Sequence, residues 1–355
     1  MANIAIYSDA KTQSQIQDIM FSSYSTLTSA LKTNLVSWYD LGSTSLGSEK
    51  SPNVTFDSNI TGWSGTNWAW ESDGEGGGRA RHTVGSTAHL QSGNILTVGL
   101  QYEVSFTVGG RTAGSVFTRA GASGSGTSRT ANGDYTQTLT CLTNGIMYVS
   151  VSSDFDGYVD NVSFKPIEAT DAQGDNEGSI YGATTNTGYT SSPSGVADPL
   201  NYGEVYGGNA VSFDGASDYI SVADSDSLSF GDGSTDSGFS ISAWINMDDA
   251  TSFPIVMKGV YNSDAEWHLW TQGDDKLYIV LYDESVSNTY EGANTSAITS
   301  YEGQWTHITA TYDGTGGTSA NNGLKIYING LSQSLTLIGS GTYVAMENLG
   351  ANVEI

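Results

Sequence analysis

Aromatic side chains lie close to polar ones at two places in this sequence, and this combination suits the binding of sugars. Flat aromatic rings stack on pyranose rings, while neighbouring polar groups form hydrogen bonds with the sugar hydroxyls. At the first place two tryptophans share one face of a predicted strand, and two arginines follow on the next strand. The candidate sugar-binding residues are Trp68, Trp70, Arg79 and Arg81 at the first place and Trp267, Trp270 and Tyr290 at the second.

The same tryptophans have a second interpretation, because a strand alternates between a buried and an exposed face. Trp68 and Trp70 form either a ligand platform or part of a core. Trp267-His-Leu-Trp270 has the alternation of a strand, so burial of at least one of its tryptophans is the alternative there.

No set of residues in the sequence matches a known catalytic constellation. Glycoside hydrolysis needs two carboxylates at a fixed separation. The acidic residues that come nearest to such a pair lie in Gly/Ser-rich turns, where solvation is the simpler interpretation, and they are Asp264, Glu266, Asp274 and Asp275. The histidines show no short ligand spacing, and no nucleophile triad, phosphate loop or dinucleotide fingerprint is recognisable. We therefore predict no catalytic residues and no enzyme activity.

The composition is that of a folded protein built from strands. The 355 residues include 44 glycines, 5 prolines and 11 % aromatic residues, and runs such as 102–108 and 146–151 alternate apolar and polar residues. With 38 acidic and 12 basic residues the formal net charge is −26, which disfavours nucleic acid and anionic membrane surfaces as partners. The sequence also contains no apolar run long enough for membrane insertion.

The first 33 residues differ from the rest because they carry a helical pattern. An apolar stripe after the N-capping candidates Ser8 and Asp9 predicts one helix of about 20 residues. The stripe consists of Ile16, Ile19, Met20, Tyr24, Leu27 and Leu31. Such a stripe must be buried, either against the chain's own sheet or as an anchor that docks on a larger assembly. The opening residues lack the basic start and apolar run of a secretory signal.

Four motifs in the second half of the chain resemble those of laminin-G-like domains, which are concanavalin A-like jelly rolls. In family order they are Val211-Ser-Phe-Asp-Gly-Ala-Ser-Asp-Tyr-Ile, Phe239-Ser-Ile-Ser-Ala-Trp-Ile, Gln304-Trp-Thr-His-Ile-Thr-Ala-Thr-Tyr-Asp-Gly and Leu324-Lys-Ile-Tyr-Ile-Asn-Gly. The opening strand of this fold resembles Leu35–Leu41, but the segment expected next appears only after a long interruption. The Glu-x-Asp-x-x-Glu strand of the glucanase relatives is absent.

The interrupting block resembles the jelly-roll carbohydrate-binding modules of the xylan- and cellulose-binding type. Its opening matches that family at Asn53, Phe56, Gly62 and Trp63, and its closing strand reads Phe-Asp-Gly-Tyr-Val-Asp-Asn-Val-Ser. Together the two resemblances imply an all-β fold of two antiparallel jelly-roll β-sandwiches, one inserted into the other, with a short N-terminal helix. The expected division is 1–33 for a helical anchor segment, 34–50 with 167–355 for the laminin-G-like domain, and 51–166 for the inserted module.

Members of the inserted family often hold a structural Ca²⁺ ion between the opening segment and the last strand. The resemblance places Asp57 and Asp160 at those positions, while Thr55 replaces a family Asp and so removes one possible ligand. In the laminin-G-like domain Asp214 and Asp218 flank a tight glycine turn, where they are either metal ligands or turn residues that bond to the backbone. A structural Ca²⁺ ion is the one cofactor that the sequence predicts.

Blocks with this Gly-Trp opening and Asp-Asn-Val closing strand occur in structural proteins of tailed bacteriophages. We therefore expect a non-enzymatic component of the virion surface, either a capsid decoration protein or a fibre, that displays glycan-binding-type domains for adhesion. Its expected partners are other virion proteins, reached through the N-terminal segment, a polysaccharide or cell-surface glycan, and copies of itself in a homo-oligomer, for which the fibre analogy suggests a trimer. The alternatives are a free extracellular bacterial polysaccharide-binding adhesin and a glycoside hydrolase accessory module.

Overall fold

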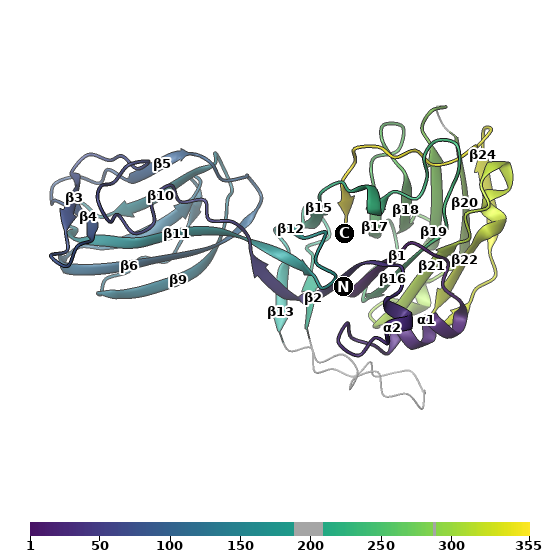
Figure 1. Cartoon of the computed structure of the whole chain (residues 1–355). Helices are drawn as coiled ribbons and strands as arrows, with labels where there is room; N and C mark the ends of the chain where they lie inside the picture. The colour runs from purple at the N-terminus through teal and green to yellow at the C-terminus, as the bar shows by residue number, and fades with distance from the viewer. Residues whose placement is uncertain (188–208, 287–288) are drawn as a thin grey trace. The chain divides into compact units, whose positions relative to one another are not determined.

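The computed structural model describes residues 1–187, 209–286 and 289–355, and strands dominate it (Figure 1). The chain forms two compact units. Unit 1 comprises residues 1–44, 169–178 and 183–355, and unit 2 comprises residues 45–168 and 179–182. Both are built from antiparallel sheets, and the predicted all-β jelly-roll class is confirmed.

The first sheet of unit 1 is centred on three strands that are buried along their whole length. In spatial order its strands are β2 (Leu35–Leu46), β1 (Ala2–Tyr7), β16 (Phe239–Ile245), β21 (Thr306–Tyr312), β22 (Leu324–Ile328) and β23 (Leu331–Ser332). Burial of every residue of β1, β16 and β21 means that both faces of the sheet are covered.

The second sheet of unit 1 carries the candidate site described below. In spatial order its strands are β15 (Tyr219–Val222), β25 (Val353–Glu354), β17 (Pro254–Lys258), β18 (Trp267–Thr271), β19 (Lys276–Asp283), β20 (Thr289–Ala297) and β24 (Thr336–Ser340). The two sheets meet where the ring of Trp267 lies 6.0 Å from that of Phe239, measured between centroids. This contact belongs to the core of the sandwich.

The remaining elements of the described chain around these sheets are short. They are the hairpin of β13 (Thr184–Thr187) and β14 (Asn209–Ser212), and the 3₁₀ turns Asp226–Leu228, Thr299–Tyr301 and Gly317–Gly323. The short strand β12 (Gly178–Tyr181) lies mostly in unit 2. None of the helices among the described residues is long and apolar enough to cross a membrane.

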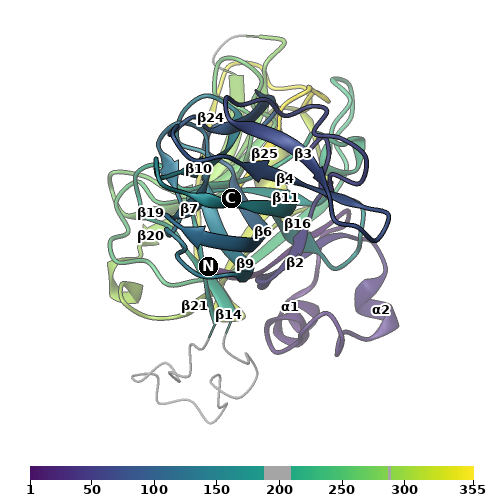
Figure 2. The same cartoon turned by 90° about the vertical axis from the view of Figure 1, so that its left-hand side faces the viewer.

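The N-terminal segment forms two short helices, so the prediction of one helix of about 20 residues is wrong. Helix α1 (Gln13–Met20) and helix α2 (Ser29–Lys32) lie beside each other (Figures 1 and 2). Thr12, rather than Ser8 or Asp9, caps α1 and shares a capping box with Gln15. A Ser/Thr-rich turn separates the helices, since Ser23 bonds to Thr26 through both backbone and side chain and thereby competes with helical pairing.

The apolar stripe of the helices packs against the chain's own sheet. Ile19, Leu27 and Leu31 join Tyr7 and Trp38 in one buried cluster. The indole of Trp244 donates a hydrogen bond to the backbone oxygen of Met20 over 3.2 Å. Residues 1–33 are therefore part of unit 1, where the sequence suggested a separate anchor segment.

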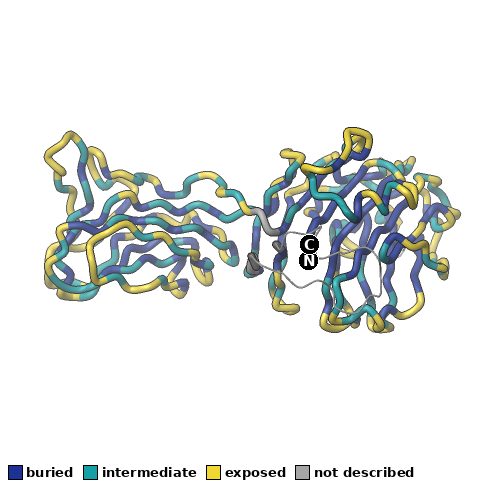
Figure 3. The backbone as a smooth tube through the Cα atoms, turned by 90° about the horizontal axis from the view of Figure 1, so that it is seen from below, coloured by how far each residue is buried: buried dark blue, intermediate teal, exposed yellow. Residues whose placement is uncertain are grey.

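Unit 2 is a smaller sandwich of two sheets. One sheet has the strands β3 (Trp68–Ser72), β4 (Gly78–His82), β11 (Asp156–Asp171), β6 (Gln101–Ala113) and β9 (Gly133–Thr140), in that order. The other has β5 (Leu90–Asn94), β10 (Ile146–Val151), β7 (Val116–Ala120) and β8 (Gly124–Ser125). Buried and less buried residues alternate along strands such as β4 and β6 (Figure 3), as expected when one face lines a core.

The opening motif of the inserted block holds the first loop of unit 2 against its core. The indole of Trp63 donates to the backbone oxygen of Asn53 over 3.1 Å, and the side chain of Asn53 accepts from the backbone of Phe56. The rings of Phe56 and Trp63 pack edge to face. The residues that carried the resemblance are thus structural in this chain.

Candidate functional site

The two faces of strand β18 have different roles, and the ladder with β19 explains why. Trp267 lies opposite Leu281 and is fully buried in the core, where its indole donates to the backbone oxygen of Leu228. This corrects the expectation that Trp267 binds sugar. His268 and Trp270 point to the other face, where Trp270 is half-buried. One of the two tryptophans is therefore core and the other is accessible.

Alternate residues of β19 and β20 extend this second face. Tyr278, Val280 and Tyr282 of β19 lie opposite residues of β20, with Tyr290 paired to Tyr282. Together these strands enclose a hollow of about 510 Å³, which we name the aromatic groove. It is lined by Met257, Tyr261, His268, Trp270, Gln272, Tyr278, Val280, Tyr282, Tyr290 and Ile338. Trp270 and Tyr290, which the sequence singled out, thus come together in one site.

The rings of the groove pack into a continuous surface. Trp270 and Tyr278 stack with 5.9 Å between their centroids and 26° between their planes. The ring of Tyr282 lies 4.8 Å from His268, 5.3 Å from Tyr261 and 6.4 Å from Tyr290. Such packing fixes the orientation of the rings before any ligand arrives. Stacking of a ligand on these rings therefore costs little conformational entropy in the protein.

The floor of the groove carries no charge at neutral pH. Burial lowers the pKa of His268 to about 4, and its Nε2 donates to the backbone oxygen of Gly259 at 2.8 Å. Burial, with a hydrogen bond to Asp274, raises the pKa of Tyr278 to about 12, and burial also raises the pKa of Tyr282. The imidazole is therefore neutral and the phenols are protonated. This chemistry suits an uncharged ligand.

Tyr261, Tyr278 and Tyr282 are the groove residues that the sequence analysis missed. A signal for two of them was present, because Tyr278 and Tyr282 are four residues apart in a strand and so share a face with each other. What the sequence did not reveal is that this face meets the face of Trp270. That juxtaposition depends on the pairing of β18 with β19.

The four carboxylates considered for hydrolysis are each engaged locally. Glu266, expected in a solvated turn, is buried beside the ammonium of Lys258 at 3.4 Å, and burial raises its pKa to about 7 against the opposing effect of Lys258. Asp264 accepts from the backbone of Val260, Asp274 pairs with Lys276, and Asp275 accepts from the hydroxyl of Thr251. The structure supplies no acid and nucleophile in facing positions from these four residues.

The candidate residues of unit 2 fall on both faces of one sheet. Trp68 is buried between His82 and Phe155, so it belongs to the core and is not a ligand platform. Trp70 is 40 % exposed, and its indole donates to the backbone oxygen of Phe56. Only Trp70 of this pair can contact a ligand.

The two arginines of the following strand are held by ion pairs. Arg79 bonds to Glu71 at 2.7 Å and lies over the ring of Tyr158. Arg81 bonds to Asp156. Because strand β4 alternates, these arginines project from the face opposite to Ala80, which lies in the core. The structure therefore does not bring Arg79 and Arg81 together with the indole of Trp70 in one site.

The carboxylates proposed to bind calcium lie near one another in unit 2. Burial raises the pKa of Asp160, and the nearby charges of Asp57 and Asp73 raise it further. Oxygen ligands of this type suit Ca²⁺. Across the ranges that the structure describes, however, no three His, Cys, Asp or Glu side chains converge as a metal-binding group. A calcium ion here would need backbone oxygens or water to complete its shell.

The second proposed metal pair is a turn in the structure. The carboxylate of Asp214 accepts from the backbone nitrogens of Ala216, Ser217 and Asp218, and these bonds lower its pKa. The backbone of Asp214 donates in return to the side chain of Asp218. This is the turn chemistry left open as the alternative to a metal site.

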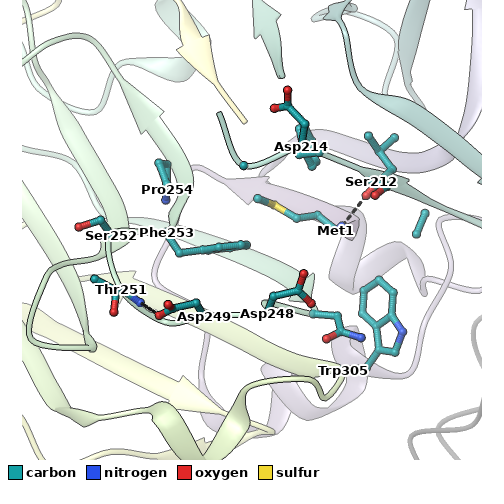
Figure 4. Close-up of a pocket in the computed structure, with 15 residues that line it drawn as sticks. Met1, Ser212, Asp214, Asp248, Asp249, Thr251, Ser252, Phe253, Pro254 and Trp305 are labelled. Atoms are coloured by element: carbon teal, nitrogen blue, oxygen red, sulfur yellow. Dashed lines mark hydrogen bonds between the residues drawn. The ribbon is translucent and has the colours of Figure 1, made fainter. Parts of the chain in front are cut away.

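Asp214 also borders a hollow of about 410 Å³ in unit 1 (Figure 4). Asp248 and Asp249 lie on its rim with Phe253 and Trp305 (Figure 4). Asp249 accepts from the backbone of Thr251, so it too is engaged in a local turn. The hollow offers fewer ring faces than the aromatic groove, and we therefore regard the groove as the candidate site.

Comparisons with known proteins agree with the fold of the second half of the chain. Residues 213–345 match the model of the concanavalin A-like lectin/glucanases superfamily. No curated protein matches the chain. One similar solved structure is the N-terminal CBM22-1–CBM22-2 tandem domain from Paenibacillus barcinonensis Xyn10C, with 10 % sequence identity and a TM-score of 0.25 over 88 % of this chain and 89 % of that chain. All residues that line the aromatic groove fall within the segment that matches the superfamily.

Proposed function

We propose that the protein binds glycans without cleaving them, and that the aromatic groove of unit 1 is its principal binding site. The observation that carries this proposal is the meeting of Trp270, Tyr278, Tyr282 and Tyr290 around one hollow on one sheet. Preordered rings offer the flat faces on which pyranose rings stack, and the phenol hydroxyls offer hydrogen bonds. The match of residues 213–345 to a superfamily of lectins and glucanases is consistent with a sugar ligand.

The groove favours a neutral polysaccharide over a charged one. Its histidine is uncharged at neutral pH, and Tyr278 and Tyr282 are protonated. An isolated charge on the ligand would lose its hydration here without meeting an opposite charge. A chain of neutral hexoses or pentoses is the ligand class that this surface fits.

The test is a titration calorimetry series with neutral cello- and xylo-oligosaccharides. We expect binding by the full chain and a loss of about tenfold or more in affinity for Trp270→Ala and for Tyr290→Ala, since one stacking ring contributes on the order of 1 kcal/mol or more. Trp70→Ala removes an exposed indole from unit 2 and is the matched control. Equal affinity in all four proteins, or release of reducing ends from the oligosaccharides, would contradict the proposal.

We also propose that the protein acts on the surface of a bacteriophage particle, as a capsid decoration protein or a fibre. The support is the resemblance of the 51–166 block to modules in phage structural proteins, together with the acidic, Gly-rich composition. Many copies on one particle would strengthen a weak single-site affinity. Because the apolar side of residues 1–33 is buried in unit 1, attachment through this segment would use its solvent-facing side.

The setting can be checked by mass spectrometry of purified virions. Peptides of this chain at a fixed ratio to a capsid or tail protein are the expected result. Recovery of the protein only from the culture medium, free of particles, would favour the alternative of an extracellular adhesin.

A structural Ca²⁺ ion near Asp57 and Asp160 remains part of the proposal. The two nearby carboxylates repel each other when both are ionised, and a bound divalent cation would offset this repulsion. Calcium should raise the melting temperature of unit 2 and a chelator should lower it, whereas Asp160→Asn should abolish the difference. An identical melting curve with calcium and with chelator would remove the idea.

A further inference from the structure

In the second sheet of unit 2, the face opposite to the core carries several polar side chains. Met147, Val149 and Val151 of β10 belong to the core, so Tyr148 and Ser150 point to the opposite side. On the neighbouring strand β7, Arg119 lies opposite Tyr148 and Phe117 lies opposite Ser150. Gln91 of β5 lies on the other side of Tyr148. With His89 these residues form what we name the Arg119 cluster, and its members are His89, Gln91, Phe117, Arg119, Tyr148 and Ser150.

The guanidinium of Arg119 lacks an anionic partner. It lies 4.9 Å from the ring centroid of Phe117, and one of its Nη atoms donates to the backbone oxygen of Ala122 over 3.3 Å. Its Nε is buried and has no hydrogen-bond partner, and no carboxylate of the described chain forms an ion pair with it. Arg79 and Arg81 on the other sheet of unit 2 are both paired with carboxylates, whereas Arg119, like Arg111 and Arg129, forms no ion pair among the described residues.

Two neighbours of Arg119 also carry buried polar atoms without a partner. These are Nδ1 of His89 and the hydroxyl of Ser150, a residue that is only 1 % exposed. The ring of His89 packs edge to face on Tyr148 with 5.3 Å between centroids. Burial and the charge of Arg119 lower the pKa of His89. A buried polar atom without a partner costs free energy, so the chain by itself leaves the polar groups of this region incompletely satisfied.

The cluster borders a hollow that could hold part of a ligand. Its volume is about 560 Å³, and it is lined by Ser64, Gly65, Thr66, Ala88, His89 and Gln91. His89 and Gln91 belong to both the hollow and the cluster. A group in this hollow would therefore lie beside the sheet face that carries Tyr148 and Arg119.

We propose that the Arg119 cluster is a second binding site, specific for the carboxylate of a uronic acid unit in an acidic polysaccharide. The fork of a guanidinium matches a carboxylate with two parallel hydrogen bonds. The rings of Tyr148 and Phe117 provide apolar surface for the sugar, and Gln91 and His89 face its hydroxyls. The formal charge of −26 makes long-range attraction of an anion unfavourable, so recognition here depends on the short-range contacts of Arg119.

The experiment compares two forms of one ligand by titration calorimetry on the full-length chain carrying Trp270→Ala. This substitution weakens the neutral-glycan groove of unit 1, so that binding of a neutral ligand there does not mask the difference. Oligogalacturonate carries the carboxylates, and its fully methyl-esterified form carries the same sugars without charge. We expect the acid to bind and the ester to bind at least about tenfold more weakly, because a charged hydrogen-bonded pair is lost. Equal binding of both forms, or of neither, would overturn the proposal.

Substitutions then assign the binding to Arg119. Arg119→Gln should weaken binding of the acid by about tenfold or more, and Arg119→Lys, which keeps the charge but not the fork, should lie between it and the parent chain. Arg79→Gln removes the same charge from the other sheet of unit 2 and should leave the affinity unchanged. Trp270→Ala should also leave it unchanged, which separates this site from the groove. Unchanged affinity in Arg119→Gln, with a melting temperature like that of the parent, would contradict the assignment.

Discussion

The aromatic groove of unit 1 and the Arg119 cluster of unit 2 both lie on the outer face of a β-sheet, but they differ in how their polar groups are satisfied. In the groove, His268 and Tyr278 have partners in Gly259 and Asp274. In the cluster, Arg119 and two of its neighbours keep buried polar atoms without a partner. The polar groups of the groove thus already have partners, and its ring faces are what it offers to a ligand. In the cluster, Nε of Arg119 has no acceptor. This difference is the reason for assigning a neutral ligand to one and an acidic ligand to the other.

The strongest way to separate the two sites is to delete residues 1–33. This removes β1, which lies between β2 and β16, and uncovers Leu35 and Trp38, the remaining members of a buried cluster. We expect unit 1 to lose its cooperative unfolding transition, and neutral-glycan binding with it, while unit 2 keeps its own transition and its acidic ligand. Calorimetric melting of the truncated chain measures both units, with unit 2 as the internal control. A truncated chain with an intact unit 1 transition would show that the segment is dispensable.

A smaller effect tests the two faces of one strand. Trp267→Ala empties a fully buried site and should lower the free energy of unfolding of unit 1 by about 3–5 kcal/mol. Trp270→Ala, on the groove face, should lower it by roughly 1 kcal/mol or less while abolishing most of the binding. Urea unfolding and glycan titration of the two variants give the comparison. Similar losses of stability in both would mean that Trp270 is part of the core, and the groove would lose its main support.

The smallest effect is a difference between two histidines. NMR titration should show His268 unprotonated down to about pH 5, because its pKa is lowered to about 4, whereas the pKa of the less buried His89 should fall less far below its usual value. Between pH 6.5 and 4 the imidazole of His268 is protonated in the unfolded chain but not in the folded one. Lowering the pH in this range therefore lowers the free energy of unfolding of unit 1. The contribution reaches roughly 3 kcal/mol at pH 4 and should vanish in His268→Gln. A normal pKa for His268 would mean that the groove floor is charged in mild acid.

The all-β class could be read from the sequence because strand alternation is local. Runs such as 239–245 and 306–312 need only their own residues to predict strands. The helical segment was predicted less well for a related reason. The apolar stripe from Ile16 to Leu31 does form one buried side. The Ser/Thr turn at 22–28 nevertheless ends the first helix through side-chain hydrogen bonds, which the apolar periodicity cannot predict.

The binding sites could be predicted only in part, since each depends on which strands become neighbours. Trp270 and Tyr290 were recognised one by one, but their meeting with Tyr278 required the register of β18, β19 and β20. The sequence did not identify Arg119 as a candidate, because an unpaired guanidinium can be recognised only when the positions of all possible carboxylate partners are known. Its isolation is a property of the whole fold.

The place of β1 in the middle of a sheet has a consequence for the order in which this protein can mature on the ribosome. Strand β1 is made before the other strands of unit 1, yet it pairs with β16, and the backbone nitrogen of Lys11, just after β1, donates to Ser240 across 229 residues of sequence. All of 45–168 is synthesised in between, so unit 2 can fold while the opening strand of unit 1 still waits for its partner. During that interval β1 can pair only with β2, and the apolar residues Ile4, Ile6 and Tyr7 lack the rest of their sheet. Nascent chains stalled before residue 239 should therefore show a protease-resistant unit 2 and a labile N-terminus, and they should depend on chaperones that bind short apolar strands.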